Sequence, residues 1–196
     1  MYVTVSTGIG SGLILGGKLY VGATGAAGEL GHVTMLPDGP LCGCGNRGCL
    51  ESLASGTAIA RRAREIAVRP GGEGILKAAR GDVNAIDASL VASAAASGDA
   101  AAAAIMRDAF EYLGIAVANV VNLLNLDMVV IGGGVARVGD ALFCAVRRLV
   151  ELRSFACMAR DVLIVPASLG DDAGALGAAC YAAEALACEE QRGMGC

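Results

Sequence analysis

The chain has 196 residues, of which 55% are hydrophobic, and carries a formal net charge of −4. This size suffices for one packed core, so we expect a single domain over residues 1–196. The acidic balance argues against nucleic-acid binding, which needs a basic face. Charged and amide side chains interrupt the apolar segment 100–124, so no run approaches the ~20 apolar residues that span a bilayer. We therefore expect no membrane contact.

The eight cysteines predict reduced thiols in the cytoplasm, because no basic region follows Met1 as it would in a signal peptide. Three of them cluster at 42–49, and the other five are scattered. We expect the scattered ones to be small buried apolar residues, apart from the one at the C-terminus. They are Cys144, Cys157, Cys180, Cys188 and Cys196.

In chain order, the first predicted elements form an antiparallel meander. Alternating and β-branched residues predict strands at 2–6, 13–15 and 18–21. A glycine-rich turn at 6–12 and a hairpin turn at 16–17 join them. The segment 22–49 shows no regular pattern, and loops of that length in a compact domain are usually functional or held by a metal.

The rest of the chain alternates helices with strands, which predicts an α/β fold with parallel later strands. Asp99 stands where the long alanine-rich helix needs an N-cap. The predicted elements are helices at about 51–68, 87–96, 100–124, 138–153 and 171–187, strands at 127–131 and 162–165, and a frayed tail at about 189–196.

The loop at 42–51 carries the strongest chemical signal. Cys42, Cys44 and Cys49 stand among glycines, and the only histidine of the chain, His32, lies just upstream. Three thiolates and one imidazole complete a tetrahedral zinc site with no open position, so we predict structural Zn²⁺. The alternative is a cluster of free thiols, which would be prone to oxidation.

Two carboxylates flank the predicted metal ligands. Glu29 precedes His32 by three residues, and Glu51 follows Cys49 by two. Carboxylates beside an imidazole suit the hydroxyl groups of a sugar. The alternatives are a solvated loop acid for Glu29 and a favourable helix N-terminal charge for Glu51.

Two glycine-rich segments are candidates for a nucleotide site. In the first, backbone N–H groups at Thr7–Gly12, with the hydroxyls of Thr7 and Ser11, suit a phosphate. In the second, Gly132–Gly134 follows a predicted buried strand and precedes a helix, as ligand crevices in α/β sheets do. Each segment alone is equally typical of an ordinary turn, but the two together favour a nucleotide.

Together these motifs resemble the ROK family (repressors, open reading frames and sugar kinases), and its bacterial glucokinase branch in particular. The resemblance rests on the segments 5–13, 28–32, 42–51, 131–135 and 168–179. It implies the second domain of an actin-like ATPase (ribonuclease H-like) fold, in which a three-strand antiparallel meander is followed by βαβα. A zinc-bound loop at about 22–51 would interrupt it.

The resemblance also implies an ATP-dependent, glucokinase-like hexose kinase that uses ATP with Mg²⁺ and forms a homo-oligomer. We take the helix at 100–124 as the candidate contact face. Glucose is the default sugar of the family, although mannose, fructose, allose and N-acetylated amino sugars are used by relatives. The implied residues are Glu29, His32 and Glu51 for the sugar, with His32 touching both zinc and sugar, Thr7, Gly8 and Gly10 for the phosphates, and Gly132, Gly133 and Gly134 for the adenosine.

One departure from the family pattern qualifies these expectations. The first domain of the family, with its own phosphate loop and the catalytic aspartate, has no counterpart in this sequence. We therefore expect the C-terminal domain alone, with the catalytic base unassigned and no activity from this chain by itself. The alternatives are the sugar-sensing domain of a ROK transcriptional repressor and a non-catalytic, zinc-stabilised fragment.

Overall fold

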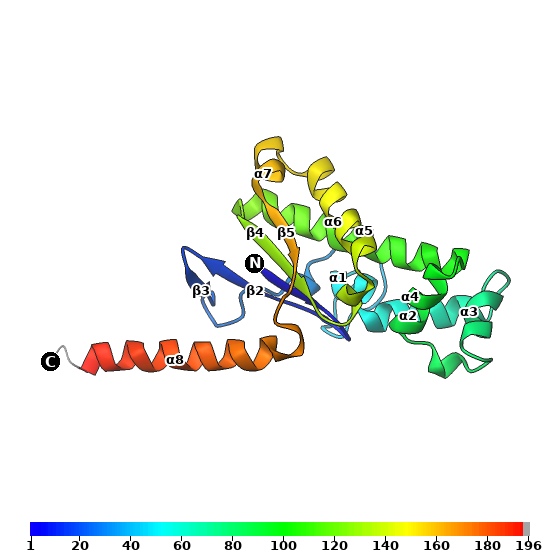
Figure 1. The fold of residues 1–196 in the computed structure, drawn as a ribbon, viewed down its shortest axis with the longest axis horizontal. Helices are drawn as coiled ribbons and strands as arrows, with labels where there is room; N and C mark the ends of the chain where they lie inside the picture. The colour runs from blue at the N-terminus through cyan, green and yellow to red at the C-terminus, as the bar shows by residue number, and fades with distance from the viewer. Residues whose placement is uncertain (194–196) are drawn as a thin grey trace. The chain divides into compact units, whose positions relative to one another are not determined.

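The computed structural model describes the backbone of residues 1–193 (Figure 1), without the side chains of 171, 184–185 and 187–193. Residues 194–196 lie outside the described part of the chain. The chain divides into two compact units, Met1–Pro166 and Ala167–Cys196. All residues predicted to bind zinc, sugar or nucleotide belong to the first unit.

A five-stranded mixed sheet forms the centre of the first unit, with strand order β3-β2-β1-β4-β5. The strands are β1 (Tyr2–Val5), β2 (Ile9–Leu15), β3 (Lys18–Tyr20), β4 (Met128–Gly132) and β5 (Leu163–Pro166). The first three pair antiparallel, whereas β1–β4 and β4–β5 pair parallel. The predicted meander and the predicted parallel pairing of the later strands agree with this register.

The helices of the first unit pack on one another and on the sheet (Figure 1). Valines and isoleucines on alternate positions of β1, β4 and β5 share one core with α5 and α6, including Val3, Val129 and Ile164. The helices are α1 (Leu50–Ala54), α2 (Gly56–Ala67), α3 (Glu73–Ala78), α4 (Ala88–Ala96), α5 (Ala100–Leu124), α6 (Asp140–Arg153) and α7 (Ala156–Asp161), with short 3-10 turns η1 (Leu30–His32), η2 (Val83–Ala85) and η3 (Val135–Val138).

The long helix α5 is the central element of the core. Asp99 caps it, since its carboxylate accepts a hydrogen bond of 2.8 Å from the N–H of Ala102. Many of its small and apolar side chains, from Ala102 to Val121, are buried within the unit, whereas Ala103 is exposed. Our expectation that this helix forms a contact face for a second copy stays a prediction. Among the described residues, no single helix is long and apolar enough to cross a membrane. Taken together, α4 and α5 have the length and the apolar composition, but the pair is bent by 117°.

The structure differs from the predicted elements in four places. The predicted turn at 6–12 is shorter, because β2 begins at Ile9. The predicted helix at 51–68 is two helices separated at Ser55, which caps α2 by accepting a hydrogen bond from Ala58. The predicted helix at 138–153 is a 3-10 turn, η3, followed by α6, and the sequence analysis missed α3 and α7 altogether.

The three scattered cysteines whose side chains the structure describes are not buried, contrary to expectation. Cys144, Cys157 and Cys180 are exposed. The reason for Cys144 is helical periodicity, because its neighbours Phe143 and Val146 occupy the buried face of α6. The side chain of Cys188 and all of Cys196 lie outside the described residues.

The second unit consists of η4 (Gly170–Asp172) and α8 (Ala173–Gly193). Helix α8 is longer than the predicted closing helix and extends into the predicted frayed tail. The rest of that tail, 194–196, lies outside the described residues.

Candidate metal, sugar and nucleotide site

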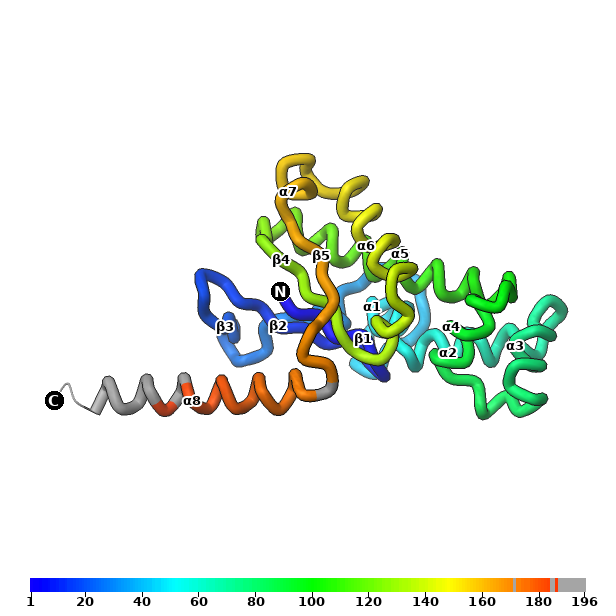
Figure 2. The backbone as a smooth tube through the Cα atoms, viewed as in Figure 1, coloured from blue at the N-terminus to red at the C-terminus, as the bar shows by residue number. Residues whose placement is uncertain are grey.

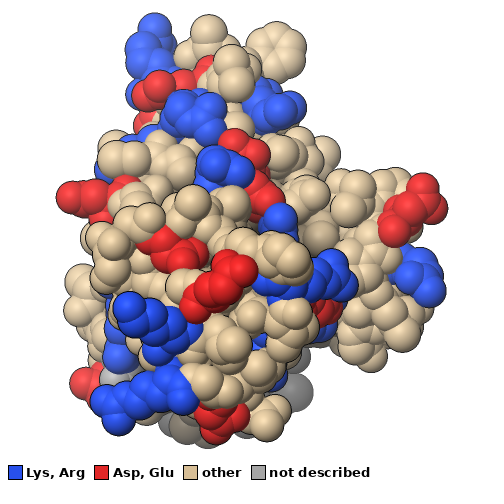
Figure 3. Space-filling view, turned by 90° about the vertical axis from the view of Figure 1, so that its right-hand side faces the viewer, with Lys and Arg blue, Asp and Glu red and all other residues tan. Residues whose placement is uncertain are grey.

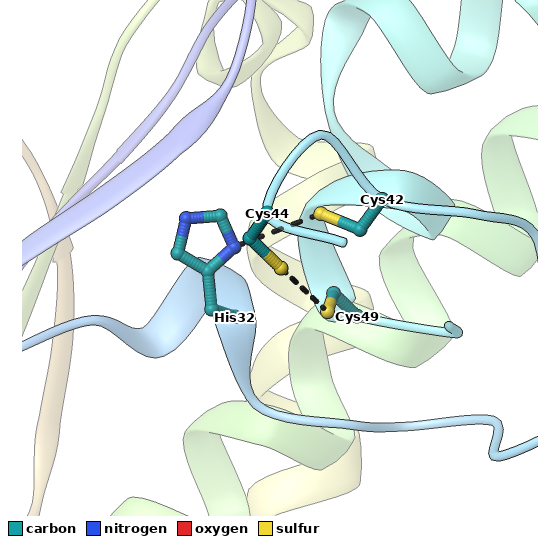
Figure 4. Close-up of side chains that lie close together, drawn as sticks. All are labelled: His32, Cys42, Cys44 and Cys49. Atoms are coloured by element: carbon teal, nitrogen blue, oxygen red, sulfur yellow. Dashed lines mark hydrogen bonds between the residues drawn. The ribbon is translucent and has the colours of Figure 1, made fainter. Parts of the chain in front are cut away.

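The four predicted metal ligands converge on one point (Figure 4). The Sγ of Cys42 lies 3.6 Å from Nδ1 of His32, and the Sγ atoms of Cys44 and Cys49 lie 3.7 Å apart. All four ligand atoms lie within 4.8 Å of one another. A tetrahedral zinc ion with Zn–S bonds of about 2.3 Å would hold its sulfurs about 3.8 Å apart. The observed spacing therefore fits zinc.

The chemistry of the donor set also fits a cation. Burial raises the pKa of Cys49 to about 12, so without a metal its thiol is neutral near pH 7. A hydrogen bond from the backbone of Asn46 instead lowers the pKa of the exposed thiol of Cys44. A bound divalent cation would stabilise the thiolates of both residues.

The glycines of the loop set its shape. The N–H of Cys42 donates to the carbonyl of Asn46 at 2.8 Å, and the N–H of Gly45 donates to the carbonyl of Cys42 at 3.0 Å. Gly48 has a φ of +64°, and any side chain there would overlap the carbonyl of Leu36. These contacts turn the chain back on itself, so that three thiols separated by few residues face the same point.

The sugar-binding candidates lie next to the metal cluster. The Nε2 of His32 lies 3.8 Å from Oε2 of Glu29, while its Nδ1 faces the thiols. Glu51 lies in the first turn of α1, which begins directly after Cys49. Glu29 and His32 stand on the first arm of the loop, and Glu51 follows the second arm. A metal ion bound by the cluster would therefore fix the backbone that carries all three side chains.

Glu51 makes a direct contact with the turn between β1 and β2. Its Oε2 accepts a hydrogen bond of 2.9 Å from the N–H of Ile9, and its carboxylate occupies the space that a side chain on Gly8 would need. In the described part of the chain, the N–H groups of Thr7 and Gly8 donate to no backbone carbonyl. They are therefore available to an anion. The hydroxyl of Ser11, which we expected to bind phosphate, instead donates to the carbonyl of Gly28.

A cleft with a volume of about 860 Å³ opens beside this turn. Thr7 lies in its lining together with Gly134, so the structure brings the two predicted nucleotide segments to one cavity. Gly133 has a φ of +91° and packs against the carbonyl of Val5, which brings the end of β4 close to the end of β1.

Helices α2 and α4 supply cleft residues that the sequence analysis missed. Arg64 donates hydrogen bonds of 3.1 and 2.8 Å to the carbonyl of Ile86. Asp87 caps α4 by accepting a hydrogen bond of 2.7 Å from Leu90. The sequence signal for Asp87 was its position as an N-cap, but nothing local indicated that α4 would line a cavity with Ser6 and Thr57.

Charges on the exposed face at the α3 end are of both signs and interspersed (Figure 3). Among the described residues, Arg62 pairs with Asp108 at 2.6 Å and Arg61 pairs with Glu65 at 3.3 Å. The tube view shows how the chain returns from β3 through η1 to α1, with η1 against both β2 and α1 (Figure 2). The β1–β2 turn thus contacts the end of the metal loop through Ile9 and Glu51, and lines the cleft through Thr7.

The fold is an α/β domain with a mixed sheet, and its loop carries a His/Cys cluster that could hold a metal ion. The ROK family matches residues 1–185, and the chain belongs to that family. It is 39% identical over 178 residues to a glucokinase from Halalkalibacterium halodurans, which covers 90% of this chain and 54% of the relative. It is 37% identical over 177 residues to a putative xylose repressor from a Caldicellulosiruptor species, which covers 90% of this chain and 44% of the relative.

Solved structures of the family share the fold. A ROK family glucokinase from Streptomyces griseus, in complex with glucose and AMPPNP, matches with a TM-score of 0.77 and 33% identity. The match covers 92% of this chain and 59% of that one. The chain thus spans about half the length of the relatives that it matches.

Proposed function

We propose that this chain is the C-terminal, zinc-bearing half of an ATP-dependent hexose kinase that acts in the cytoplasm. The observation that carries the proposal is the adjacency of three groups around the β1–β2 turn. Glu29 lies beside His32 of the four candidate metal ligands, and Glu51 hydrogen-bonds Ile9 at one end of the turn. Thr7 of the same turn lines the cleft together with Gly134. Phosphoryl transfer needs the sugar hydroxyl that accepts the phosphate to lie next to the turn that binds the phosphates of ATP.

In this proposal the sugar binds to Glu29, His32 and Glu51, which offer carboxylate and imidazole groups to sugar hydroxyls. The phosphates of ATP, with Mg²⁺, bind at Thr7, Gly8 and Gly10, and the adenosine binds near Gly132–Gly134 in the cleft. Zn²⁺ at His32, Cys42, Cys44 and Cys49 is structural, because four protein ligands leave no open position. The actin-like, ribonuclease H-like assignment of the fold belongs to the same proposal.

The general base is not assigned to this chain. Asp87 is the carboxylate that lines the described cleft, and its Oδ1 already accepts a hydrogen bond from Leu90. A base must lie within hydrogen-bond reach of the sugar hydroxyl whose proton it takes, and Asp87 lines the cleft proposed for the nucleotide rather than standing among the sugar candidates. We therefore place the base in a part of the kinase that the relatives have and that this chain does not match.

The second candidate is the sugar-sensing domain of a ROK repressor, which the 37% identity to a putative xylose repressor favours. A repressor domain binds sugar without transferring phosphate, so nucleotide binding separates the two candidates. Isothermal titration of the zinc-loaded chain with glucose, mannose, N-acetylmannosamine, xylose and Mg-AMPPNP is the decisive measurement. A kinase half binds a hexose and the nucleotide, whereas a sensor binds sugar alone. A chain that binds neither is the non-catalytic fragment, and the kinase proposal fails.

Catalysis is tested by sugar-dependent ADP release. The assay is run with this chain alone and with the complementary half of the Halalkalibacterium halodurans relative. We expect no useful turnover by the chain alone, because loss of a positioned base costs about 10²–10⁴-fold. Restoration of turnover by the added half supports the kinase. Turnover by the chain alone would contradict our placement of the base.

A further inference from the structure

We propose that Glu51 is a positioning residue for the nucleotide, in addition to its proposed role toward the sugar. It holds the turn Ser6–Ile9 in the shape that leaves the N–H groups of Thr7 and Gly8 without a backbone acceptor among the described residues, at a turn whose Thr7 lines the cleft. The inference rests on the proposed function, because it concerns the nucleotide that the turn binds. The two interpretations of Glu51 from sequence were a sugar ligand and a helix N-terminal charge, and neither involves the turn.

The contact is specific to one oxygen of the carboxylate. Oε2 accepts the hydrogen bond from Ile9 N–H at 2.9 Å, and no hydrogen bond to Oε1 is found among the described residues. A hydrogen bond to a charged acceptor is stronger than one between neutral groups. One oxygen of Glu51 is thus committed to the turn, and the other remains for a ligand.

The rest of the turn is held from different directions. The N–H of Ser6 donates to the carbonyl of Gly8 at 2.9 Å, which closes the turn on itself. The N–H of Gly56, the first residue of α2, donates to the carbonyl of Ser6 at 2.7 Å. Glu51 fixes the opposite end of the turn by accepting the hydrogen bond from Ile9. Without it, the Ile9 end of the turn keeps its β-sheet pairing with β1 and its packing against Gly31.

Both arms of the metal loop reach the same residue. Glu51 follows Cys49 and contacts the N–H of Ile9, whereas Gly31 precedes His32 and lies against the carbonyl of Ile9. A side chain on Gly31 would overlap that carbonyl. The N–H and the carbonyl of Ile9 are therefore each in contact with a segment that carries candidate metal ligands. This is why we assign nucleotide positioning to a residue of the metal loop.

Three variants of the zinc-loaded chain test the inference by titration with Mg-AMPPNP in the absence of sugar. Glu51→Ala removes both oxygens, and we expect the Kd for the nucleotide to rise about tenfold. Glu51→Gln keeps an oxygen that can accept from Ile9 but lacks the charge that strengthens the bond, so we expect its Kd to rise by about two- to threefold, less than in Glu51→Ala. The control is Glu65→Ala, which removes an exposed carboxylate paired with Arg61 on α2 and should not change the Kd.

A second measurement does not depend on nucleotide binding. Hydrogen exchange at the amide of Ile9 should quicken in Glu51→Ala, stay slow in Glu51→Gln and be unchanged in Glu65→Ala, because only the first variant lacks an acceptor. Zinc content and thermal unfolding are measured on the same samples. A residue that acted only on sugar would leave both the nucleotide Kd and the exchange of Ile9 unchanged.

The outcomes separate this inference from the proposed function. Equal nucleotide affinity in Glu51→Ala and the wild type overturns the inference and leaves the kinase proposal standing. Weaker binding that appears only with loss of zinc or of the unfolding transition also overturns it, because Glu51 would then act through folding. A wild-type chain that binds no nucleotide sinks the proposed function and with it the nucleotide role, whereas the Ile9 exchange then reports on the contact alone.

Discussion

The hydroxyl of Thr57 donates a hydrogen bond of 2.8 Å to the carbonyl oxygen of Thr7. The N–H of Thr57 reaches the same carbonyl at 3.3 Å, so the first turn of α2 holds the β1–β2 turn by two donors. Both residues line the cleft. The proposed phosphate-binding turn therefore depends on an element some fifty positions away in sequence, and its shape is a tertiary property.

Replacement of Thr57 by valine tests this dependence. Thr57→Val keeps the shape of the side chain but removes the hydroxyl donor, while the backbone N–H remains. We expect nucleotide affinity to fall by about 2–10-fold, in line with about 0.5–1.5 kcal/mol for one neutral hydrogen bond. Titration with Mg-AMPPNP measures the effect, and affinity for glucose serves as the internal control because Thr57 does not contact the sugar candidates. A change in glucose affinity alone would contradict the assignment.

The metal cluster makes a second prediction. Chain purified without chelator should contain one zinc per chain, and Cys44→Ser should lower zinc affinity and speed proteolysis within 22–49. The reason is that metal binding supplies folding free energy to a loop with little regular structure of its own. The matched control is Cys144→Ser, an exposed thiol outside the cluster, which should retain full zinc. Elemental analysis without zinc in the wild type would refute the site.

The buried thiol of Cys49 predicts a pH dependence for the metal-free chain. Its pKa is raised from 9.0 to about 12, with burial as the largest cause. A group whose pKa is raised on folding contributes stability that is present below pH 9.0 and is lost as pH rises towards 12. Urea unfolding of the chelator-treated chain between about pH 8 and about pH 10.5, an interval that spans the ordinary thiol pKa, should therefore show falling stability as pH rises.

A matched variant isolates this effect from other groups that titrate in the same range. Cys49→Ser keeps a small polar side chain that does not titrate, so its metal-free form should lose less stability over the same pH interval. Equal pH dependence in the two proteins would show that another group is responsible.

Much of the fold followed from local patterns. Alternation predicted the meander, and Asp87 and Asp99 marked the starts of α4 and α5 correctly. The break between α1 and α2 was missed because residues 51–68 favour one continuous helix. Its cause is tertiary: Gly56 donates to the carbonyl of Ser6, and an added Cβ at Gly56 would lie 2.8 Å from that oxygen. A continuous helix could not bring α2 against the turn in this way.

The candidate site likewise has one part that local sequence spacing predicts and another that depends on tertiary packing. The metal ligands lie within 18 positions of one another in the sequence, and short-range spacing was enough to predict that they converge. Glu51 was singled out by its position next to Cys49, but its contact with Ile9 depends on how α1 meets β2. Arg64 and Asp87 carried no sequence signal for a ligand site, because their place in the cleft arises from the packing of α2 against α4.

The close packing of α5 against α6 makes the last prediction. A Cβ added at Gly114 would lie 2.6 Å from Cδ1 and 2.9 Å from Cβ of Leu149, which is itself buried on α6. Gly114→Ala must therefore push the two helices apart, and we expect a loss of about 1–3 kcal/mol in the free energy of unfolding, despite the better helix propensity of alanine. The control is Gly177→Ala on α8, where an added Cβ meets nothing within 4 Å and no loss is expected.

Leu149→Ala alone should also destabilise, because it leaves a cavity. In the Leu149→Ala background the contact with Cδ1 is absent while the contact with Cβ remains, so Gly114→Ala should cost less there, and urea unfolding of the four proteins in a double-mutant cycle measures the difference. An equal cost in both backgrounds would show that the end of the Leu149 side chain is not the reason for glycine at 114.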